Sequence, residues 1–228
     1  LDLAVRGLLV PQDPNDEPAS VLLDKITSEK ARLVKEGKIK KKKPSPDIDE
    51  NKKNFKAPRN WRWVRLDSIS EFINGYAFKS SDFNDNGIRV VKIGDIQNGI
   101  ISAKNMSRVS SKVVEPLNEN LKISKHDMVI AMSGATTGKL GFSLSEETYY
   151  LNQRVGKIVT HLCDPKFIYF PLTTKIAENL AQSRGMAIPN LSTAQINEIV
   201  LALPPLAEQH RIVAKVDELM ALCDTLEQ

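Results

Sequence analysis

Between Ala57 and Leu203 the sequence is divided into short apolar runs separated by glycine-containing turns. The runs are rich in β-branched and aromatic residues, and they read "WRWVRL", "IRVVKI", "DMVIAM", "KLGFSL" and "YYLNQRVGKIV". Short runs of this kind, bounded by stretches such as "DNG" and "QNG", are typical of strands joined by tight turns. Two helical stretches follow, and Ser192 or Thr193 is expected to cap the second. The pattern predicts an α+β fold with a twisted β-sheet and short helices.

The stretch "SGATTGK", residues 133–139, invites comparison with a phosphate-binding loop. Such a loop has four residues between its glycines and a hydroxyl residue after its lysine, because backbone N–H groups surround the phosphate and the hydroxyl reaches Mg²⁺. Here three residues separate Gly134 from Gly138, and Leu140 follows the lysine. We therefore interpret the stretch as a turn between two strands, which argues against a nucleotide-dependent enzyme.

Composition narrows the function classes further. The chain has 228 residues, of which 41% are hydrophobic, so it can bury one substantial core or two small ones. No apolar run reaches the roughly 18 residues of a membrane span, and we expect a cytoplasmic protein with no membrane partner. Cys163 and Cys223 lack paired spacing, and the histidines are scattered. We expect no metal site, no cofactor and no catalytic residue.

The C-terminal stretch 204–228 has the clearest helical periodicity. Pro204 and Pro205 mark its start, because proline is tolerated in the first turn of a helix. Beyond them a 4-3-4-3 spacing places one apolar stripe between charged faces, formed by Ile212, Val216, Leu219, Cys223 and Leu226. The stripe predicts a coiled-coil seam, which we interpret as a partner or dimer interface. Packing of the helix on its own domain is the alternative.

The N-terminal region, residues 1–36, is also expected to be helical. A helix is predicted from about Glu17 to Glu36, with Asp16 as a possible N-cap and Gly37 as its stop. The first residues repeat the 4-3 apolar spacing, at Leu1, Val5 and Leu8. Because the sequence starts without Met inside this pattern and ends without a cap signal, we expect a fragment cut within two helices.

Residues 37–56 are predicted to form a lysine-rich linker. The stretch 35–56 holds 9 lysines and 4 acidic residues, whereas both ends of the chain are net acidic. With few apolar residues it cannot bury a core, so a mobile linker or solvated loop is expected. A basic middle between acidic ends fits a polyanion-binding domain flanked by protein-binding arms, although ordinary solvated surfaces carry similar charge.

The ordered motifs resemble one family. The stretches that carry the resemblance are "APRNWRWVRLDSI", "IRVVKIGDIQNG", "KHDMVIAMSGATTGKLG", "YLNQRVGKI" and "AIPNLSTAQINEIVLALPPLAEQHRIVAKVDEL". They resemble a target recognition domain and the adjoining conserved helix of the specificity subunit of type I restriction–modification enzymes. The resemblance implies a conserved helical tail over 1–36 before the linker, a DNA-binding target recognition domain over 57–203, and the start of a conserved coiled-coil helix over 204–228.

The resemblance also implies a function. Such a subunit is a non-catalytic DNA reader that recognises one half of a bipartite target in double-stranded DNA. It recruits modification (methyltransferase) subunits and a restriction subunit that carries the motor and nuclease. The family usually has two recognition domains held apart by long antiparallel helices, and one is visible here. A half-size subunit acting as a homodimer through its helices is therefore one alternative, and a coiled-coil structural adaptor without specific DNA binding is another.

Five polar loops of the predicted domain carry the candidate DNA-binding residues. A duplex reader needs cations for phosphates and amides or guanidinium groups for base edges, on loops that a sheet holds in place. The residues that fit are Lys79, Gln97, Asn98, Thr136, Lys139, Gln153, Arg154 and Arg184. For the glycine-rich turn 133–139, a purely structural role is the alternative. Tyr76 and Phe78 are expected to pack rather than stack on bases, because an intact duplex hides its base faces.

Overall fold

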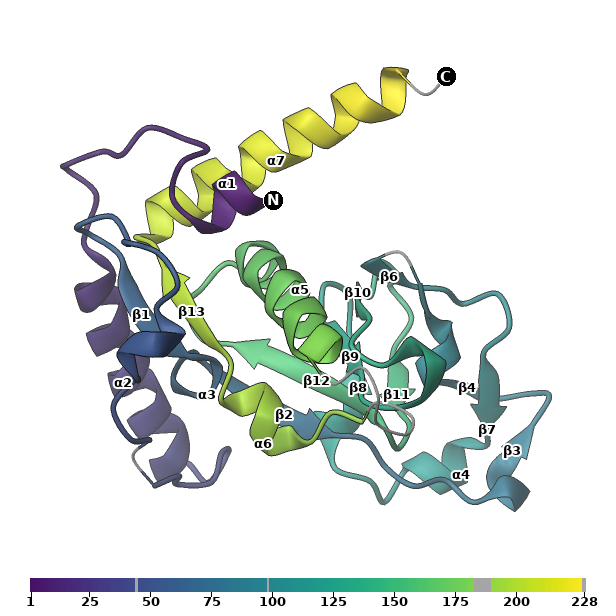
Figure 1. The fold of residues 1–228 in the computed structure, drawn as a ribbon. Coiled ribbons are helices and arrows are strands. Elements are labelled where there is room, and N and C mark those ends of the chain that lie inside the picture. The colour runs from purple at the N-terminus through teal and green to yellow at the C-terminus, as the bar shows by residue number, and fades with distance from the viewer. Residues whose placement is uncertain (44, 98, 183–189, 227–228) are drawn as a thin grey trace. The chain divides into compact units, whose positions relative to one another are not determined.

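The protein divides into two compact units, each built from separate stretches of the chain. The computed structural model describes residues 1–226 except 44, 98 and 183–189 (Figure 1). Unit 1 comprises Leu1–Glu71, Thr160–Leu172 and Asn197–Gln228, and unit 2 comprises Phe72–Val159 and Thr173–Ile196. Both helices and mixed sheets are present, which confirms the α+β class.

Unit 1 contains helices and one small sheet. Strands β1 (Arg62–Arg65) and β13 (Val200–Leu203) pair antiparallel, with Val64 opposite Leu201. This pairing explains why both ends of the segment 57–203 group with the chain termini instead of with unit 2. The helical elements of this unit are α1 (Asp2–Val5), α2 (Ala19–Lys35), η1 (Glu50–Lys52), α3 (Leu66–Ile69), α7 (Leu206–Leu226) and the start of α5 (Pro165–Gln182).

Helix α2 begins later than the sequence predicted, and Asp16 does not cap it. Its N-cap is Pro18, with no side-chain cap bond. The Asp16 carboxylate instead accepts two hydrogen bonds from the Arg211 guanidinium of α7, at 3.0 and 2.5 Å. A salt bridge to a distant helix has replaced the local cap. Gly37 does end the helix as predicted, in a left-handed conformation with φ of 71°.

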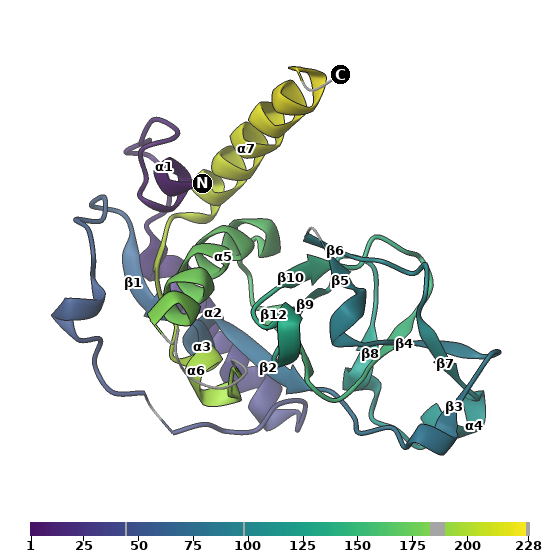
Figure 2. The same ribbon diagram turned by 45° about the vertical axis from the view of Figure 1, so that its right-hand side comes forward.

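The core of unit 1 forms where α7 meets the N-terminal half of the chain. Trp61 is buried, and its indole N–H donates to a carboxylate oxygen of Glu208 at 2.8 Å. Burial raises the pKa of Glu208. Helix α1 lies beside the first half of α7 in both ribbon views (Figures 1 and 2). Ile212 is fully buried there, whereas Leu219 is 39% exposed and Leu226 is 88% exposed.

The predicted stripe on α7 therefore faces two different environments. Its first residue, Ile212, packs in the core of unit 1, as the alternative interpretation proposed. Val216 is half-buried, and Leu219, Cys223 and Leu226 are exposed on the later turns of the helix. The later turns of α7 therefore leave apolar side chains exposed, where a partner can cover them.

Unit 2 is built around two sheets. The six-stranded sheet has the order β2 (Ser70–Asn74), β12 (Val155–Thr160), β9 (Met128–Ala131), β10 (Leu140–Phe142), β6 (Gly99–Ile101) and β5 (Ile96–Gln97). The five-stranded sheet has the order β3 (Phe83–Asn84), β7 (Ser107–Val109), β4 (Ile88–Val91), β11 (Tyr149–Leu151) and β8 (Lys122–Ile123). The pairs β6–β10 and β4–β11 are parallel. The short helical elements are η2 (Ser80–Asp82), η3 (Ile93–Asp95), α4 (Ser111–Val114), η4 (Glu119–Leu121), η5 (Gly134–Thr136) and α6 (Thr193–Asn197).

The run "YYLNQRVGKIV" forms two strands in different sheets, although its composition suggested one. β11 belongs to the five-stranded sheet and β12 to the six-stranded sheet. The chain turns between them at residues 152–154, where Arg154 has a left-handed backbone with φ of 67°. The polar residues inside the run therefore marked a turn.

Strands of the five-stranded sheet bury side chains on both faces. Tyr149 and Leu151 of β11 join one apolar cluster, and Tyr150 joins another. On β4, Val91 and Val90 divide between the same two clusters. Because successive side chains of a strand point to opposite faces, a strand covered on both sides is a continuous apolar run. The two apolar clusters hold the five-stranded sheet in place, and with it the ends of the loops that join its strands.

Candidate nucleic-acid interface

The stretch 132–139 is the turn that joins β9 to β10, as the sequence predicted. β9 and β10 pair antiparallel, with Ile130 opposite Leu140. Inside the turn, the backbone N–H groups of Thr137, Gly138 and Lys139 donate to carbonyl oxygens of the same hairpin, at 2.8–3.1 Å. These N–H groups are thus already used within the chain. A phosphate-binding loop needs such groups free and aimed at its ligand, so this turn is not one.

Gly138 allows the turn to pack against helix α5. Its φ is 83°, and a Cβ at this position would lie 2.5 Å from Ile176 and 2.8 Å from Leu180. A bridge between Ser133 and Asn190 joins the turn to the segment that precedes α6. The turn is therefore held on two sides, which fixes the positions of its exposed side chains.

A second loop, residues 92–97, lies against the same turn. The Thr136 hydroxyl donates to the Ile93 carbonyl at 3.0 Å. The short helix η3 in this loop is closed by Asp95, whose carboxylate accepts from the Lys92 backbone N–H at 2.8 Å. Burial raises the pKa of Asp95. At the end of the loop, the Gln97 amide donates to the Gly94 carbonyl at 2.9 Å.

A third loop, residues 152–154, lies beside the hairpin and beside Tyr76. The Met132 backbone N–H donates to the Arg154 carbonyl at 2.8 Å, and the Gln153 N–H donates to the Tyr76 carbonyl at 2.7 Å. Gly75 makes this approach possible, since a Cβ there would lie 1.9 Å from the Asn152 carbonyl oxygen. We call the combined surface of residues 75–76, 92–97, 132–139 and 152–154 the loop ridge.

The loop ridge brings together five of the eight predicted DNA-binding residues. Gln97, Lys139, Gln153 and Arg154 are exposed, and Thr136 is half-buried. Within the described part of the chain, the charged groups of Lys139 and Arg154 have no hydrogen-bond or ion-pair partner. Free cations beside amide and hydroxyl groups are the combination that contacts phosphates and base edges.

Three predicted residues stand apart from this arrangement. Lys79 is exposed, but no described hydrogen bond ties it to the loop ridge, and its backbone N–H donates to Asp82 at 2.7 Å. Asn98 and Arg184 lie outside the described residues. Phe78 is buried, as expected for a packing residue, whereas the neighbouring Tyr76 is 41% exposed.

The contacts between loops are what sequence reasoning missed. The ammonium group of Lys92 lies 3.8 Å from the Phe83 ring centroid and donates to the Ser107 hydroxyl at 2.7 Å. Ile93 carries no polar side chain, yet its carbonyl anchors Thr136. Neither contact has a sequence signal, because each depends on strand order.

The chain is similar in sequence to proteins of one family. Residues 58–228 match the family described as type I restriction modification DNA specificity domain. The chain is 40% identical over 234 residues to the EcoAI specificity subunit of Escherichia coli, covering 99% of this chain and 39% of that subunit. It is 33% identical over 241 residues to the EcoEI specificity subunit of the same species, covering 99% and 40%.

This chain belongs to the type I restriction modification DNA specificity domain family. It spans 39–40% of the length of these two relatives. The HsdS subunit from Thermoanaerobacter tengcongensis has a similar fold, with a TM-score of 0.56 and 18% identity, covering 91% of this chain and 50% of that one. Among the described residues, no helix combines the length and apolar character needed to cross a bilayer.

Proposed function

We propose that this chain is a non-catalytic reader of double-stranded DNA that recognises one half of a bipartite target through the loop ridge of unit 2. The observation that carries the proposal is the clustering of Lys139 and Arg154 with Thr136 and Gln153 on loops anchored to one another. Family membership supports the same function. Rigid loops matter because readout of base edges requires donors and acceptors held at fixed positions.

The side chains of the loop ridge divide between two tasks. Lys139 and Arg154 are suited to backbone phosphates, since both are exposed cations without an internal partner in the described chain. Gln153 and Thr136 offer an amide and a hydroxyl, which discriminate between bases by hydrogen bonding. Phosphate contacts fix the register of the protein on the duplex, and base contacts supply the sequence preference.

The later turns of α7 are proposed to bind partner proteins. Leu219, Leu222 and Leu226 expose apolar surface there, which a coiled-coil partner helix would cover. Together with the N-terminal segment, this helix would belong to long coiled-coil-forming helices that recruit modification and restriction subunits in the cytoplasm. A homodimer formed through the same helices is the second arrangement that this surface allows.

Selection of bound sequences from a random duplex pool, followed by binding titrations, tests the DNA-reading function. Lys139→Ala should weaken binding to all sequences alike and lower the slope of log affinity against log salt by about one. Lys112→Ala, on the exposed side of α4, is the matched control and should leave both unchanged. If the wild-type chain with its modification subunit enriches no sequence, the proposal is wrong.

A further inference from the structure

Unit 1 contains a large basic cavity that the DNA-reading function leaves unexplained. The cavity has a volume of about 1120 Å³ and is lined entirely by residues between Thr27 and Glu71. Its walls come from α2, from the lysine-rich segment, and from β1 with α3. Ligand sites are commonly about 300–1,000 Å³ in volume, so this cavity is large enough to hold several groups of an extended ligand.

The charge of the cavity wall is strongly positive. Eight lining residues are Lys or Arg, and four are Asp or Glu. Lys30 and Lys42 share one carboxylate partner within the wall, Glu71, at 3.1 and 2.7 Å. Lys40, Lys41 and Lys43 are exposed, and no partner for their ammonium groups exists within the described residues. These three lysines are therefore cations of the wall that can pair with a bound anion.

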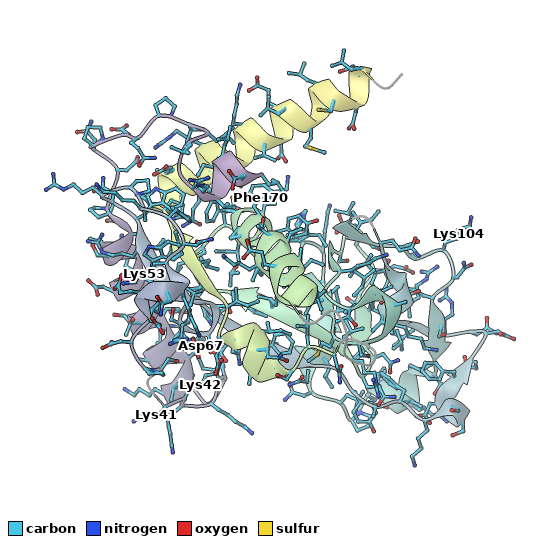
Figure 3. All side chains as sticks on the ribbon, in the orientation of Figure 1. Lys41, Lys42, Lys53, Asp67, Lys104 and Phe170 are labelled. Atoms are coloured by element: carbon cyan, nitrogen blue, oxygen red, sulfur yellow. The ribbon has the colours of Figure 1, made fainter. Side chains whose placement is uncertain are left out.

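The lysine-rich segment of the wall is tied to the rest of unit 1 by hydrogen bonds. The buried Arg65 guanidinium donates to the carbonyl oxygens of Pro46 and Asp47, at 3.1–3.3 Å. The Ser45 hydroxyl donates to the Asp67 carboxylate at 3.0 Å. The labelled side chains of Lys41, Lys42, Lys53 and Asp67 lie in the region beside α2 (Figure 3). A concave basic surface fixed by hydrogen bonds concentrates a positive field more effectively than a mobile chain does.

We propose that this cavity binds phosphodiester groups of the nucleic-acid backbone, with Lys40, Lys41 and Lys43 as the contacting residues. The proposal rests on the DNA-reading function, because the ligand of that function is itself a polyanion. Unpaired lysines bind phosphate as point charges, and release of counterions from the nucleic acid favours the contact.

The site would add affinity without adding sequence preference. No Asn or Gln lines the cavity, whereas Gln97 and Gln153 carry amides on the loop ridge of unit 2. Base edges are distinguished by bidentate amide or guanidinium contacts, and both guanidinium groups of the cavity, Arg62 and Arg65, already donate to backbone carbonyls. Unit 1 would therefore bind nucleic acid of any sequence, and unit 2 would discriminate between target sequences.

Acetylation of lysine amines on the full chain, with and without duplex DNA of scrambled sequence, tests the site directly. Lys40, Lys41 and Lys43 should be protected several-fold by the duplex. Lys35, Lys52 and Lys56 are also exposed lysines of unit 1, but they do not line the cavity and should react equally in both samples. Equal reaction of all six lysines in the presence of DNA overturns the proposal.

The salt dependence of DNA affinity, measured for two triple variants, gives a second test. Replacing Lys40, Lys41 and Lys43 with Ala should lower the salt slope of DNA affinity by about 3 and leave the selected target sequence unchanged. The same change at Lys35, Lys52 and Lys56 removes equal charge and should have a much smaller effect. Equal losses in the two variants overturn the proposal, as does protection by a nucleoside triphosphate or by polyglutamate but not by DNA. Protection at the cavity without any enriched target would refute only the function of unit 2.

Discussion

At the scale of single residues, the loop ridge depends on the missing side chain of Gly75. A Cβ there would lie 1.9 Å from the Asn152 carbonyl oxygen, a backbone atom that cannot rotate away. Gly75→Ala should therefore lower the free energy of unfolding by roughly 1–3 kcal/mol, measured by urea denaturation. Gly94→Ala is the control, because no atom lies within 4 Å of its added Cβ. Equal urea midpoints for the two variants would contradict this account of the loop contact.

His161 should make the stability of the protein depend on pH. Burial, together with the nearby Lys30 ammonium, lowers the pKa of this imidazole. The unfolded chain takes up a proton at this imidazole near pH 6.5, whereas the folded chain takes it up only at lower pH. The stability that this difference affects is therefore full above pH 6.5 and falls as the pH drops below it. The free energy of unfolding, measured by urea denaturation, should therefore be lower at about pH 5.5 than at about pH 7.5.

The comparison of two histidine variants checks this assignment. His161→Gln should flatten the pH dependence between about pH 7.5 and 5.5. His210→Gln, which removes an imidazole that is 62% exposed, should keep most of it. If the unfolding free energy of both variants changes with pH as it does in the wild-type chain, His161 is not the source of the acid sensitivity.

Features that depend on one residue and its sequence neighbours, such as turns and helix ends, were the easiest to predict from the sequence. The glycines of the turn 133–139 and the stop at Gly37 followed from backbone freedom alone. The cap of α6 is Ser192, which accepts from the Gln195 N–H at 3.2 Å while Gln195 accepts from the Ser192 N–H at 2.9 Å. Asp16 looked like a similar cap but pairs with Arg211, 195 positions away. Such a long-range partner cannot be read from neighbouring residues.

At the scale of elements, α7 should show two separable roles. Ile212 is fully buried in unit 1, and Leu219 is 39% exposed. Ile212→Ala should reduce the free energy of unfolding by about 2–4 kcal/mol, because it opens a cavity in the core. Leu219→Asp should leave folding nearly intact while weakening association with a partner helix.

Urea denaturation and sedimentation measurements distinguish these two roles. The Ile212 variant should unfold at lower denaturant, and the Leu219 variant should retain its midpoint but lose binding to modification subunits or to a second copy. Unfolding of the whole unit by Leu219→Asp, seen by circular dichroism, would show that the stripe is entirely core and would refute the seam.

Longer apolar strands were predictable elements, and the shortest strands were not. All four residues of β9 are apolar, and three of the four residues of β4 are β-branched. β3, β5 and β8 each have two residues, too few for any alternation to appear. Their strand character comes from pairing with distant partners, as for β5 with β6. Pairing with distant partners also explains why the run "YYLNQRVGKIV" forms two strands, β11 and β12, in different sheets.

At the scale of the whole molecule, the division into units was the least predictable feature. β1 pairs with β13 across more than half of the chain, so the two ends of the segment 57–203 group with the termini. Local patterns do not encode such a pairing. The assembly of the loop ridge could not be predicted from local patterns either. Its residue types were predicted, but which loops come together depends on the order of strands in both sheets.

The chain as a whole should lack intrinsic catalytic activity. The hairpin that resembles a phosphate loop has the N–H groups of Thr137, Gly138 and Lys139 committed to its own carbonyls. Purified protein should therefore not hydrolyse ATP, and it should neither cleave nor methylate DNA without partner subunits. Assays on fractions from two unrelated purification schemes check this, and an activity abolished by Lys139→Ala alone would contradict it.

DNA reading by the loop ridge is tested by comparing the sequences that three forms of the chain select. Wild-type chain, Gln153→Ala and Lys112→Ala are each used, with the modification subunit, to select from a random duplex pool. We expect one shared target, with discrimination at a single position weakened by roughly 1–3 kcal/mol in Gln153→Ala and no change in Lys112→Ala. If substitutions at Thr136, Lys139, Gln153 and Arg154 all leave both affinity and target unchanged, the loop ridge does not read DNA.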